Sequence, residues 1–422
     1  MKVFKFGGAS VKNADAIRNA AQIIGLYEQP LIVVVSAMGK TTNALEKLWT
    51  AYVNHNQTSV SNSLEELFSF HTELIYELTN DKSTAIEKFK GSFNNLVKYL
   101  KKEPSEHLAY EYDQIVSFGE LWSTLILSDQ LSEIGIENRW KDARKIIRTS
   151  NHYQEARVDW TKTRELVKRI ITQEFIDSPK LRCVVTQGFI GHTNTGMTTT
   201  LGREGSDFSA AILAWAVDAN QVLIWKDVPG LLNADPKEFE NTIKIDKISY
   251  KEAIELSYFG ASVIHPKTLK PLQNKQIPLV IKSFLDPKAE GSIIQHDQVN
   301  DANQASYIYK SNQLLLSISA KDFSFIMEDH ISEIFMVFSA HGLKVHLMQN
   351  SALSFSVCAD IKKTMLNPLI ERLSQNFTVK YNDDVDLLTI RHYKRHEFPE
   401  KLKSKEILIK QRSRSTLRYV LR

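Results

Sequence analysis

The chain has 422 residues, more than a single hydrophobic core usually organises, so we expect two or three domains. Its 43% hydrophobic and 24% charged residues are ordinary for a globular protein and exclude a disordered, collagen-like or fibrous chain. The 53 Lys and Arg against 49 Asp and Glu leave a net charge of only +4, which gives no reason to expect a nucleic-acid partner.

The apolar segments are short. The longest, Leu31–Met38, falls far below the roughly 20 residues that cross a bilayer. The first residues alternate like a strand and lack the apolar core of a signal peptide. We therefore expect a cytoplasmic protein with no membrane partner. Cys183 and Cys358 lie in apolar, strand-like segments, where we expect buried, reduced thiols and not a disulfide.

The N-terminal segment predicts a strand, a glycine turn, a helix and a second strand. Lys2–Phe6 alternates as a strand does and ends at Gly7 and Gly8, and Ala14–Leu26 has helical periodicity. Leu31–Val35 is a continuous β-branched run, which is typical of a strand buried on both faces. This order indicates an α/β domain with an open, mainly parallel sheet sandwiched by helices.

A helical insertion interrupts this alternation at about 43–103, where apolar residues recur at helical spacing and no strand is convincing. A long helix follows over Ser117–Ile134. The α/β alternation then resumes, with strands at Arg182–Gln187, Gln221–Trp225 and Leu279–Lys282 and helices at Asp207–Val217 and Tyr250–Leu256. We place the first domain at 1–297.

The pattern changes in the remaining residues. Strands at Leu314–Ser319, Leu343–Met348, Ser354–Ala359 and Thr378–Asn382 alternate with helices at Glu328–His341 and Thr364–Gln375. This β-α-β-β-α-β order predicts a ferredoxin-like α+β domain at 305–384.

A further strand, Val385–Ile390, precedes a basic tail, and we interpret 385–422 as a truncated second module. Apolar residues interleave with the basic ones in this tail, which favours strands with a solvated face over a nucleic-acid site.

One face of the ferredoxin-like sheet is predicted to be apolar, at Leu314, Leu316, Ile318, Phe355 and Val357. A module of this size should not leave such a face in water, so we expect a homodimer formed through these domains.

Four clusters carry residues suited to phosphate and carboxylate chemistry. Gly7 and Gly8 follow a strand beside Lys5, where bare backbone amides could approach phosphate, although such a pair is often only a turn. Arg203 precedes a helix start, and its guanidinium suits a carboxylate. Asp227 comes directly after a strand, at the edge where α/β sheets bind ligands. Structural explanations also exist, namely Ser206 or Asp207 as a helix cap and Glu120, in the fourth cluster, as a helix-dipole partner.

Together the motifs KFGGASV, VVVSAMGKTTN, VSFGELWSTLIL, TTTLGREGSDFSAAILA, DVPGLLNADPK and FGASVIHPKTL, in this order, resemble aspartokinases of the amino-acid kinase superfamily. The resemblance covers Lys2 to about Ile294, and 305–385 resembles the regulatory ACT domain of that family. It implies transfer of the ATP γ-phosphoryl group to the β-carboxylate of L-aspartate, giving 4-phospho-L-aspartate, with Mg²⁺. The acceptor carboxylate is already ionised near neutral pH, so the reaction needs positioning and charge neutralisation and not a strong base.

The resemblance also implies residue roles. Lys5 and Asp207 would be catalytic, with Asp207 organising the lysine. Residues expected to bind aspartate are Thr42, Glu120, Arg203 and Ser206. Residues expected on the ATP side are Lys5, Gly7, Gly8, Lys226, Asp227, Leu232, Lys237 and Ser262. We expect no metal ligand from the protein itself.

Departures from the family pattern cluster on the nucleotide side. Lys226, Leu232 and Lys237 stand where the family has threonine, tyrosine and arginine, and Ser262 replaces a lysine that contacts ATP phosphates. We hypothesise that Lys226 supplies the displaced charge.

Two alternatives remain: another kinase of the superfamily, or a catalytically weak amino-acid-sensing regulator, which Ser262 would favour. We expect the ACT-like region to bind a feedback amino acid, whether the chain is an aspartate kinase or a regulator. His346 and Ala352 stand where lysine-sensing relatives carry acids, which argues against lysine, and an effector loop is predicted at Gln349, Asn350 and Ser351.

Overall fold

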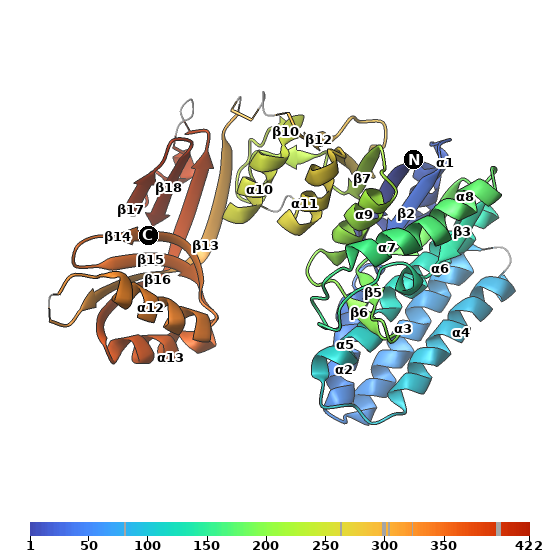
Figure 1. Ribbon diagram of the computed structural model, residues 1–422, viewed down its shortest axis with the longest axis horizontal. Coiled ribbons are helices and arrows are strands. Elements are labelled where there is room, and N and C mark those ends of the chain that lie inside the picture. The colour runs from blue at the N-terminus through green and yellow to red at the C-terminus, as the bar shows by residue number, and fades with distance from the viewer. Residues whose placement is uncertain (80–81, 262–263, 298–300, 303, 323, 394–397) are drawn as a thin grey trace. The chain divides into compact units, whose positions relative to one another are not determined.

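A computed structural model describes residues 1–79, 82–261, 264–297, 301–302, 304–322, 324–393 and 398–422 (Figure 1). The chain forms two compact units, which are described separately. Unit 1 comprises Met1–Leu231, Lys244–Ile254 and Ile264–Gln298, and unit 2 comprises Leu232–Ile243, Glu255–Val263 and Val299–Arg422. Among the described residues, no helix combines the length and apolar character that crossing a membrane requires.

Unit 1 is built on an eight-stranded sheet in the order β10-β12-β11-β7-β1-β2-β4-β3. The six strands from β3 to β11 in this order are parallel, and β12 runs antiparallel to β11. The expected mainly parallel sheet is therefore confirmed. The strand bounds are Lys2–Phe6 (β1), Leu31–Val35 (β2), Asn138–Lys141 (β3), Cys183–Gln187 (β4), Gln221–Lys226 (β7), Lys247–Ser249 (β10), Leu279–Ser283 (β11) and Ser292–Gln295 (β12).

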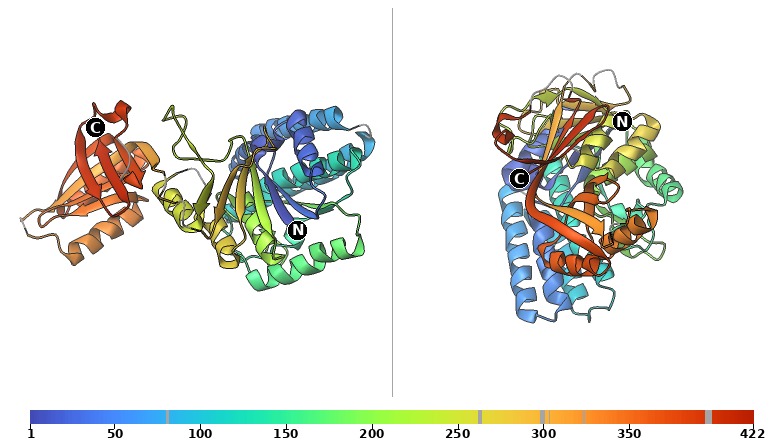
Figure 2. Two further views of the ribbon diagram at one scale, coloured as in Figure 1. Left: turned by 90° about the horizontal axis from the view of Figure 1, so that it is seen from above. Right: turned by 90° about the vertical axis from the view of Figure 1, so that its left-hand side faces the viewer.

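Helices cover both faces of this sheet, which explains why all five residues of β2 are buried (Figure 2). On one face, Phe4, Phe6, Val33 and Val35 join a core with residues of α1 and α6. On the other face, α9 packs against β1, β2 and β7, and α7 and α11 pack against α9. These helices span Ala14–Gly25 (α1), Phe118–Glu133 (α6), Trp160–Val167 (α7), Gly205–Ala216 (α9) and Pro266–Lys275 (α11). A further helix, α10 (Tyr250–Phe259), begins in unit 1 and ends in unit 2.

The segment predicted to be a helical insertion contains three helices, α2 (Thr41–Val53), α3 (Gln57–Leu78) and α4 (Lys82–Leu100). Aromatic rings of α3 and α4 pack around the buried indole of Trp122 on α6, which attaches the insertion to the sheet layer. A separate helix that the sequence did not reveal, α5 (Leu108–Val116), leads into α6.

Unit 2 contains a six-stranded sheet in the order β14-β15-β13-β16-β18-β17. The first four strands with α12 and α13 form the expected ferredoxin-like arrangement, with all strand pairs antiparallel. The bounds are Ser306–Ala320 (β13), Glu328–Ala340 (α12), Lys344–Asn350 (β14), Phe355–Asp360 (β15), Lys363–Ser374 (α13), Phe377–Arg391 (β16), Ile407–Arg412 (β17) and Thr416–Leu421 (β18).

Two sequence expectations about this sheet need correction. The strands predicted at Thr378–Asn382 and Val385–Ile390 are one strand, β16, because register shifts between Lys310 and Leu315 absorb the irregularity opposite Asp384, which has a φ of 56°. The predicted boundary between residues 384 and 385 therefore falls inside β16.

The second correction concerns the apolar sheet face. Leu314, Leu316, Ile318, Phe355 and Val357 belong to one core with Ile334 and Phe338 of α12 and Leu369 and Leu373 of α13. The chain's own helices cover this face, so the argument that it requires a partner chain was wrong.

Candidate functional site

A pocket of about 480 Å³ opens at the carboxyl ends of β1 and β2, on unit 1. Strands β2, β4 and β3 extend to one side of β1, and β7 and β11 extend to the other. This reversal of strand order is where open α/β sheets bind ligands. The lining residues are Lys5, Ser36, Thr42, Tyr112, Glu120, Gln154, Glu155, Phe189, Thr200, Gly202, Arg203, Glu204, Gly205, Ser206 and Asp207.

The predicted catalytic pair is in direct contact. Lys5 Nζ lies 2.5 Å from Asp207 Oδ1, and both side chains are almost completely buried. Lys5 is the fourth residue of the central strand, and Asp207 lies in the first turn of α9. The carboxylate therefore compensates a buried ammonium and fixes its position at the floor of the pocket.

Glycines allow the elements around this pair to approach. A Cβ on Gly188, just after β4, would lie 2.5 Å from Ser206 Cβ, so only glycine lets the start of α9 meet that strand end. A Cβ on Gly8 would lie 2.9 Å from the Ala37 carbonyl oxygen. Gly8 thus permits the turns after β1 and β2 to touch. A Cβ on Gly7 would lie 3.4 Å from Lys5 Nζ, so glycine at this position leaves space beside the lysine.

Glu120 is placed at the pocket by the start of α6. A Cβ on Gly119 would lie 2.9 Å from Ala37 Cβ, so glycine lets this helix meet the turn after β2. Glu120 Oε1 accepts a hydrogen bond from Ala37 N at 3.2 Å, whereas its buried Oε2 has no hydrogen-bond partner among the residues that the structure describes. Burial raises the pKa of the Glu120 carboxyl to about 8, against the lowering effects of hydrogen bonds to backbone amides and of the Lys5 charge. A cationic ligand group beside Oε2 would satisfy this carboxylate.

The remaining predicted aspartate-binding residues also line the pocket. Arg203 is exposed, in the loop between β6 (Thr198–Thr200) and α9. Thr42 lies in the first turn of α2, and Ser206 in the first turn of α9. Together with Lys5, the predicted aspartate-binding residues therefore bring a buried cation, an exposed guanidinium, a carboxylate and two hydroxyl groups to the pocket. This set suits a small zwitterionic ligand with additional negative charge.

The sequence did not reveal the role of Asp113 of α5. This residue does not line the pocket, but it is hydrogen-bonded to Gln154 and Thr200, which do. This fully buried carboxylate accepts hydrogen bonds from Thr200 N at 2.8 Å, Thr200 Oγ1 at 2.7 Å and Gln154 N at 3.1 Å. Burial raises its pKa to about 6 despite these hydrogen bonds. The available signal was an acid on the apolar side of a helix, but its partners lie 41 and 87 residues away along the chain.

The residues predicted on the ATP side lie in both units. Lys226 ends β7, where its side chain is half-buried, and Asp227 is exposed directly after it. In unit 2, Leu232 belongs to the two-residue strand β8 (Leu231–Leu232). Lys237 is exposed in a turn where its backbone amide donates to Asp235 Oδ1 at 2.9 Å. Ser262 lies outside the described residues.

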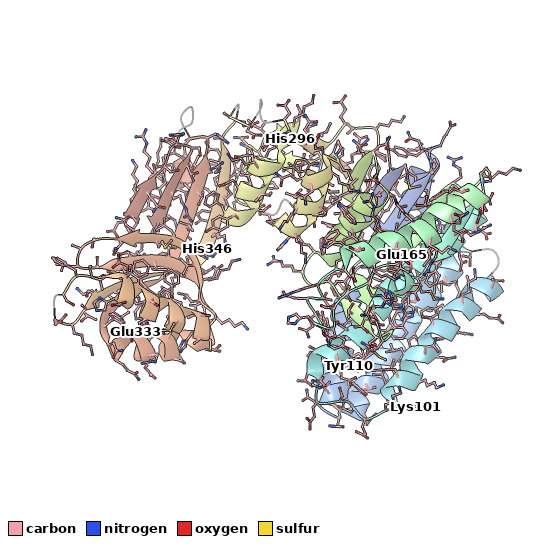
Figure 3. The ribbon with its side chains drawn as sticks, in the orientation of Figure 1. Lys101, Tyr110, Glu165, His296, Glu333 and His346 are labelled. Carbon is pink, nitrogen blue, oxygen red and sulfur yellow. The ribbon has the colours of Figure 1, made fainter. Side chains whose placement is uncertain are left out.

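The residues predicted to bind an effector differ in exposure. His346, labelled in Figure 3, is buried in β14, and its Nε2 lies 2.6 Å from Asp360 Oδ2. Burial lowers its pKa, against the raising effect of Asp360. Gln349, Asn350 and Ser351 are exposed at the end of β14 and just beyond it.

The part of the chain that the structure describes contains no group of three or more His, Cys, Asp or Glu side chains placed to hold a metal ion. Mg²⁺ in kinases is commonly held by phosphate oxygens and water with one or two carboxylates.

Comparison with known proteins identifies the family of the chain. A sequence model of the amino acid kinase family matches residues 1–283. The chain is 33% identical over 359 residues to lysine-sensitive aspartokinase 3 of Escherichia coli (strain K12), covering 85% of this chain and 78% of that protein.

Solved structures agree. The chain is similar to E. coli aspartokinase III in complex with lysine and aspartate, with a TM-score of 0.83 and 28% identity, covering 100% of this chain and 95% of the other. It is also similar to E. coli aspartokinase III in complex with aspartate and ADP, with a TM-score of 0.80 and 28% identity, covering 100% and 96%.

Proposed function

The chain belongs to the aspartokinases of the amino acid kinase family, and we propose that it transfers the ATP γ-phosphoryl group to the β-carboxylate of L-aspartate. The observation that carries this proposal is the buried Lys5–Asp207 pair at the floor of a pocket that Glu120 and Arg203 also line. Lys5 supplies positive charge for phosphoryl transfer. Glu120 matches the ammonium group of an amino acid, and Arg203 matches its α-carboxylate.

In the proposed reaction, Arg203 pairs with the α-carboxylate of aspartate, while Glu120 Oε2 receives the α-ammonium. Thr42 and Ser206 supply hydroxyl groups. The β-carboxylate is then directed toward Lys5. One of its oxygens attacks the γ-phosphorus as the bond to the β,γ-bridging oxygen breaks, so that 4-phospho-L-aspartate forms and ADP leaves.

The nucleotide places its phosphates near the carboxyl end of β1. Backbone amides at Gly7 and Gly8 and the Lys5 ammonium would contact the transferred group, since negative charge accumulates there. Within unit 1, we assign further nucleotide contacts to Lys226 and Asp227. The roles of Leu232 and Lys237 in unit 2, and of Ser262 outside the described residues, stay predictions from the sequence. Mg²⁺, when bound to the phosphates, neutralises part of their charge.

A hydroxamate assay tests the proposal, because hydroxylamine traps an acyl phosphate. Purified full-length chain with ATP, Mg²⁺ and L-aspartate should yield aspartyl hydroxamate. Glutamate and N-acetylglutamate serve as alternative carboxylate acceptors in the same assay. UMP gives no acyl phosphate, so its phosphorylation is followed by the release of ADP. Turnover of one of these in place of aspartate would assign a different kinase activity, and turnover of none would support an amino-acid-sensing regulator.

We also infer that unit 2 binds a feedback amino acid and joins two chains. Exposed apolar side chains support the second inference, namely Phe335 and Met336 on α12 and Met348 on β14. Surfaces of this kind often become buried by association. Sedimentation of the full chain at micromolar concentration should give a dimer, and a persistent monomer would contradict the inference.

A cytoplasmic location agrees with the state of the two cysteines. Cys183 and Cys358 are both buried and unpaired, and burial raises the pKa of each thiol to about 12. Thiols of this kind are normal in a reducing compartment.

A further inference from the structure

A second pocket adjoins the aspartate pocket in unit 1. Its volume is about 360 Å³, and it is lined by segments that precede or begin α7, α9 and α11. It shares Glu155 and Arg203 with the first pocket, whereas Lys5, Thr42, Glu120 and Asp207 do not line it. The other residues that line the second pocket have no role in the proposed phosphoryl transfer or in aspartate binding.

Cationic side chains predominate around the second pocket. Arg157, Arg203 and Lys267 line it, against one carboxylate, that of Glu155. Glu204 lies nearby, but its Oε2 accepts a hydrogen bond from His265 N at 2.8 Å. An anion would therefore enter a site whose lining is net positive.

Lys267 is the most enclosed of these cations. Its side chain is half-buried, and its Nζ donates to the Leu201 carbonyl oxygen at 3.0 Å. Burial lowers the pKa of Lys267, and the Arg203 charge lowers it further, against the raising effects of Glu204, Glu155 and Asp207. An ammonium has three N–H donors, so one carbonyl oxygen does not use its full capacity.

The wall beside these cations is apolar and aromatic. Trp160 and Phe208 meet edge to face with ring centroids 6.2 Å apart, and Val158 and Leu201 complete the wall. Lys267 Nζ lies 5.7 Å from the centre of the Phe208 ring. A ligand in this space would contact rings at one end and cations at the other.

We propose that this second pocket binds a small organic anion, a carboxylate or phosphate joined to an aromatic or aliphatic body. The anionic group would contact Lys267, Arg157 and Arg203, and the body would pack on Trp160 and Phe208. Because Arg203 also lines the aspartate pocket, the bound anion competes with L-aspartate for that guanidinium. This competition rests on the proposed aspartate kinase function, whereas binding itself does not.

Direct titration of the full chain tests the binding. Phenylacetate and phenyl phosphate present the two anionic groups on the same ring, and phenylacetamide is the uncharged control. In isothermal titration calorimetry without aspartate or ATP, at least one of the two anions should bind, and phenylacetamide should bind about tenfold more weakly, since charge-assisted hydrogen bonds are lost. Equal binding of phenylacetamide, or no binding of either anion, would overturn the proposal.

Variants locate the binding. K267Q and R157Q should each weaken the bound anion several-fold. K270Q should not, because Lys270 is an exposed lysine of the same helix and does not line the pocket. If neither K267Q nor R157Q weakens binding, the anion occupies another place and the proposal fails.

In kinase assays the bound anion should raise the KM for aspartate without lowering kcat. An unchanged KM under saturating anion would overturn the competition. If the chain shows no kinase activity with aspartate, the calorimetric result still decides whether the pocket binds anions, so the two proposals fail separately.

Discussion

Lys5 and Asp207 connect the central strand to the helix that follows the Arg203 loop, with 2.5 Å between Lys5 Nζ and Asp207 Oδ1. Both side chains are almost completely buried, where an unpaired charge would be strongly destabilising, so the ion pair compensates each of them. The ammonium is thus held at the floor of the pocket before any substrate arrives. Such fixed charge stabilises a transition state without reorganising during the reaction.

Lys5→Met should therefore lower kcat by at least about a hundredfold, because the charge is needed as phosphoryl transfer proceeds. It should also lower the melting temperature, since Asp207 loses its buried partner. Lys2→Met is the matched control, at the other end of the same strand, and should leave kcat unchanged. Near-normal turnover of a folded Lys5→Met variant would remove Lys5 from the mechanism.

Glu120 predicts a pH dependence of aspartate binding. Its pKa of about 8 means that much of the ligand-free enzyme carries a neutral carboxyl at pH 7. An α-ammonium binds the ionised form better, so the KM for aspartate should fall as pH rises from about 6.5 to 8.5. Glu120→Gln should raise the KM and flatten this profile. A native KM that does not change with pH would contradict the assignment.

The same raised pKa has a consequence for stability. Burial raises the pKa of Glu120 in the folded state above its ordinary value of 4.5, so the ionisation of Glu120 disfavours the ligand-free fold as pH rises from about 4.5 toward 8. Aspartate restores a partner to the carboxylate. The increase in melting temperature caused by aspartate should accordingly be larger at pH 8 than at pH 6, and Glu120→Gln should remove the difference.

Asp113 is predicted to position the pocket without touching substrate. Asp113→Ala leaves Thr200 N and Gln154 N without their acceptor, which should reduce the free energy of unfolding by about 1–3 kcal/mol. Because Gln154 and Thr200 line the aspartate pocket, the KM for aspartate should rise as well. Asp129→Ala, which removes a carboxylate paired with Lys88, is a control that should leave the KM unchanged. A normal KM in Asp113→Ala would reduce Asp113 to a stabilising role.

The sequence predicted the elements and residues that short local patterns encode. The β-branched run of β2 predicted a buried strand of the sheet. The family-like motifs predicted six of the fifteen residues that line the aspartate pocket, namely Lys5, Thr42, Glu120, Arg203, Ser206 and Asp207. The sequence did not reveal the partners of Asp113, since these depend on how α5 packs against a distant loop. The apolar face at Leu316 was recognised, but alternation alone does not show whether a helix or another chain covers it.

The last prediction concerns Lys226. This residue is proposed to supply the positive charge that is lost where Ser262 replaces the lysine of the family pattern. Lys226 ends β7, and its backbone carbonyl accepts a hydrogen bond from Phe284 N at 2.9 Å, so the strand end that carries it is anchored. A lysine acts on phosphate as a point charge and needs no particular orientation. If Lys226 serves the ATP phosphates, Lys226→Thr should raise the KM for ATP about tenfold while the KM for aspartate stays unchanged.

Ser262→Lys alone should then have little effect, because the charge is already supplied. The double variant should recover most of the ATP affinity that Lys226→Thr loses. Such non-additivity is expected when two residues compete for one role, since independent sites would give additive free energies. If Lys226→Thr leaves the KM for ATP unchanged, the charge has not moved to Lys226, and nucleotide binding in this chain proceeds without a lysine at either position.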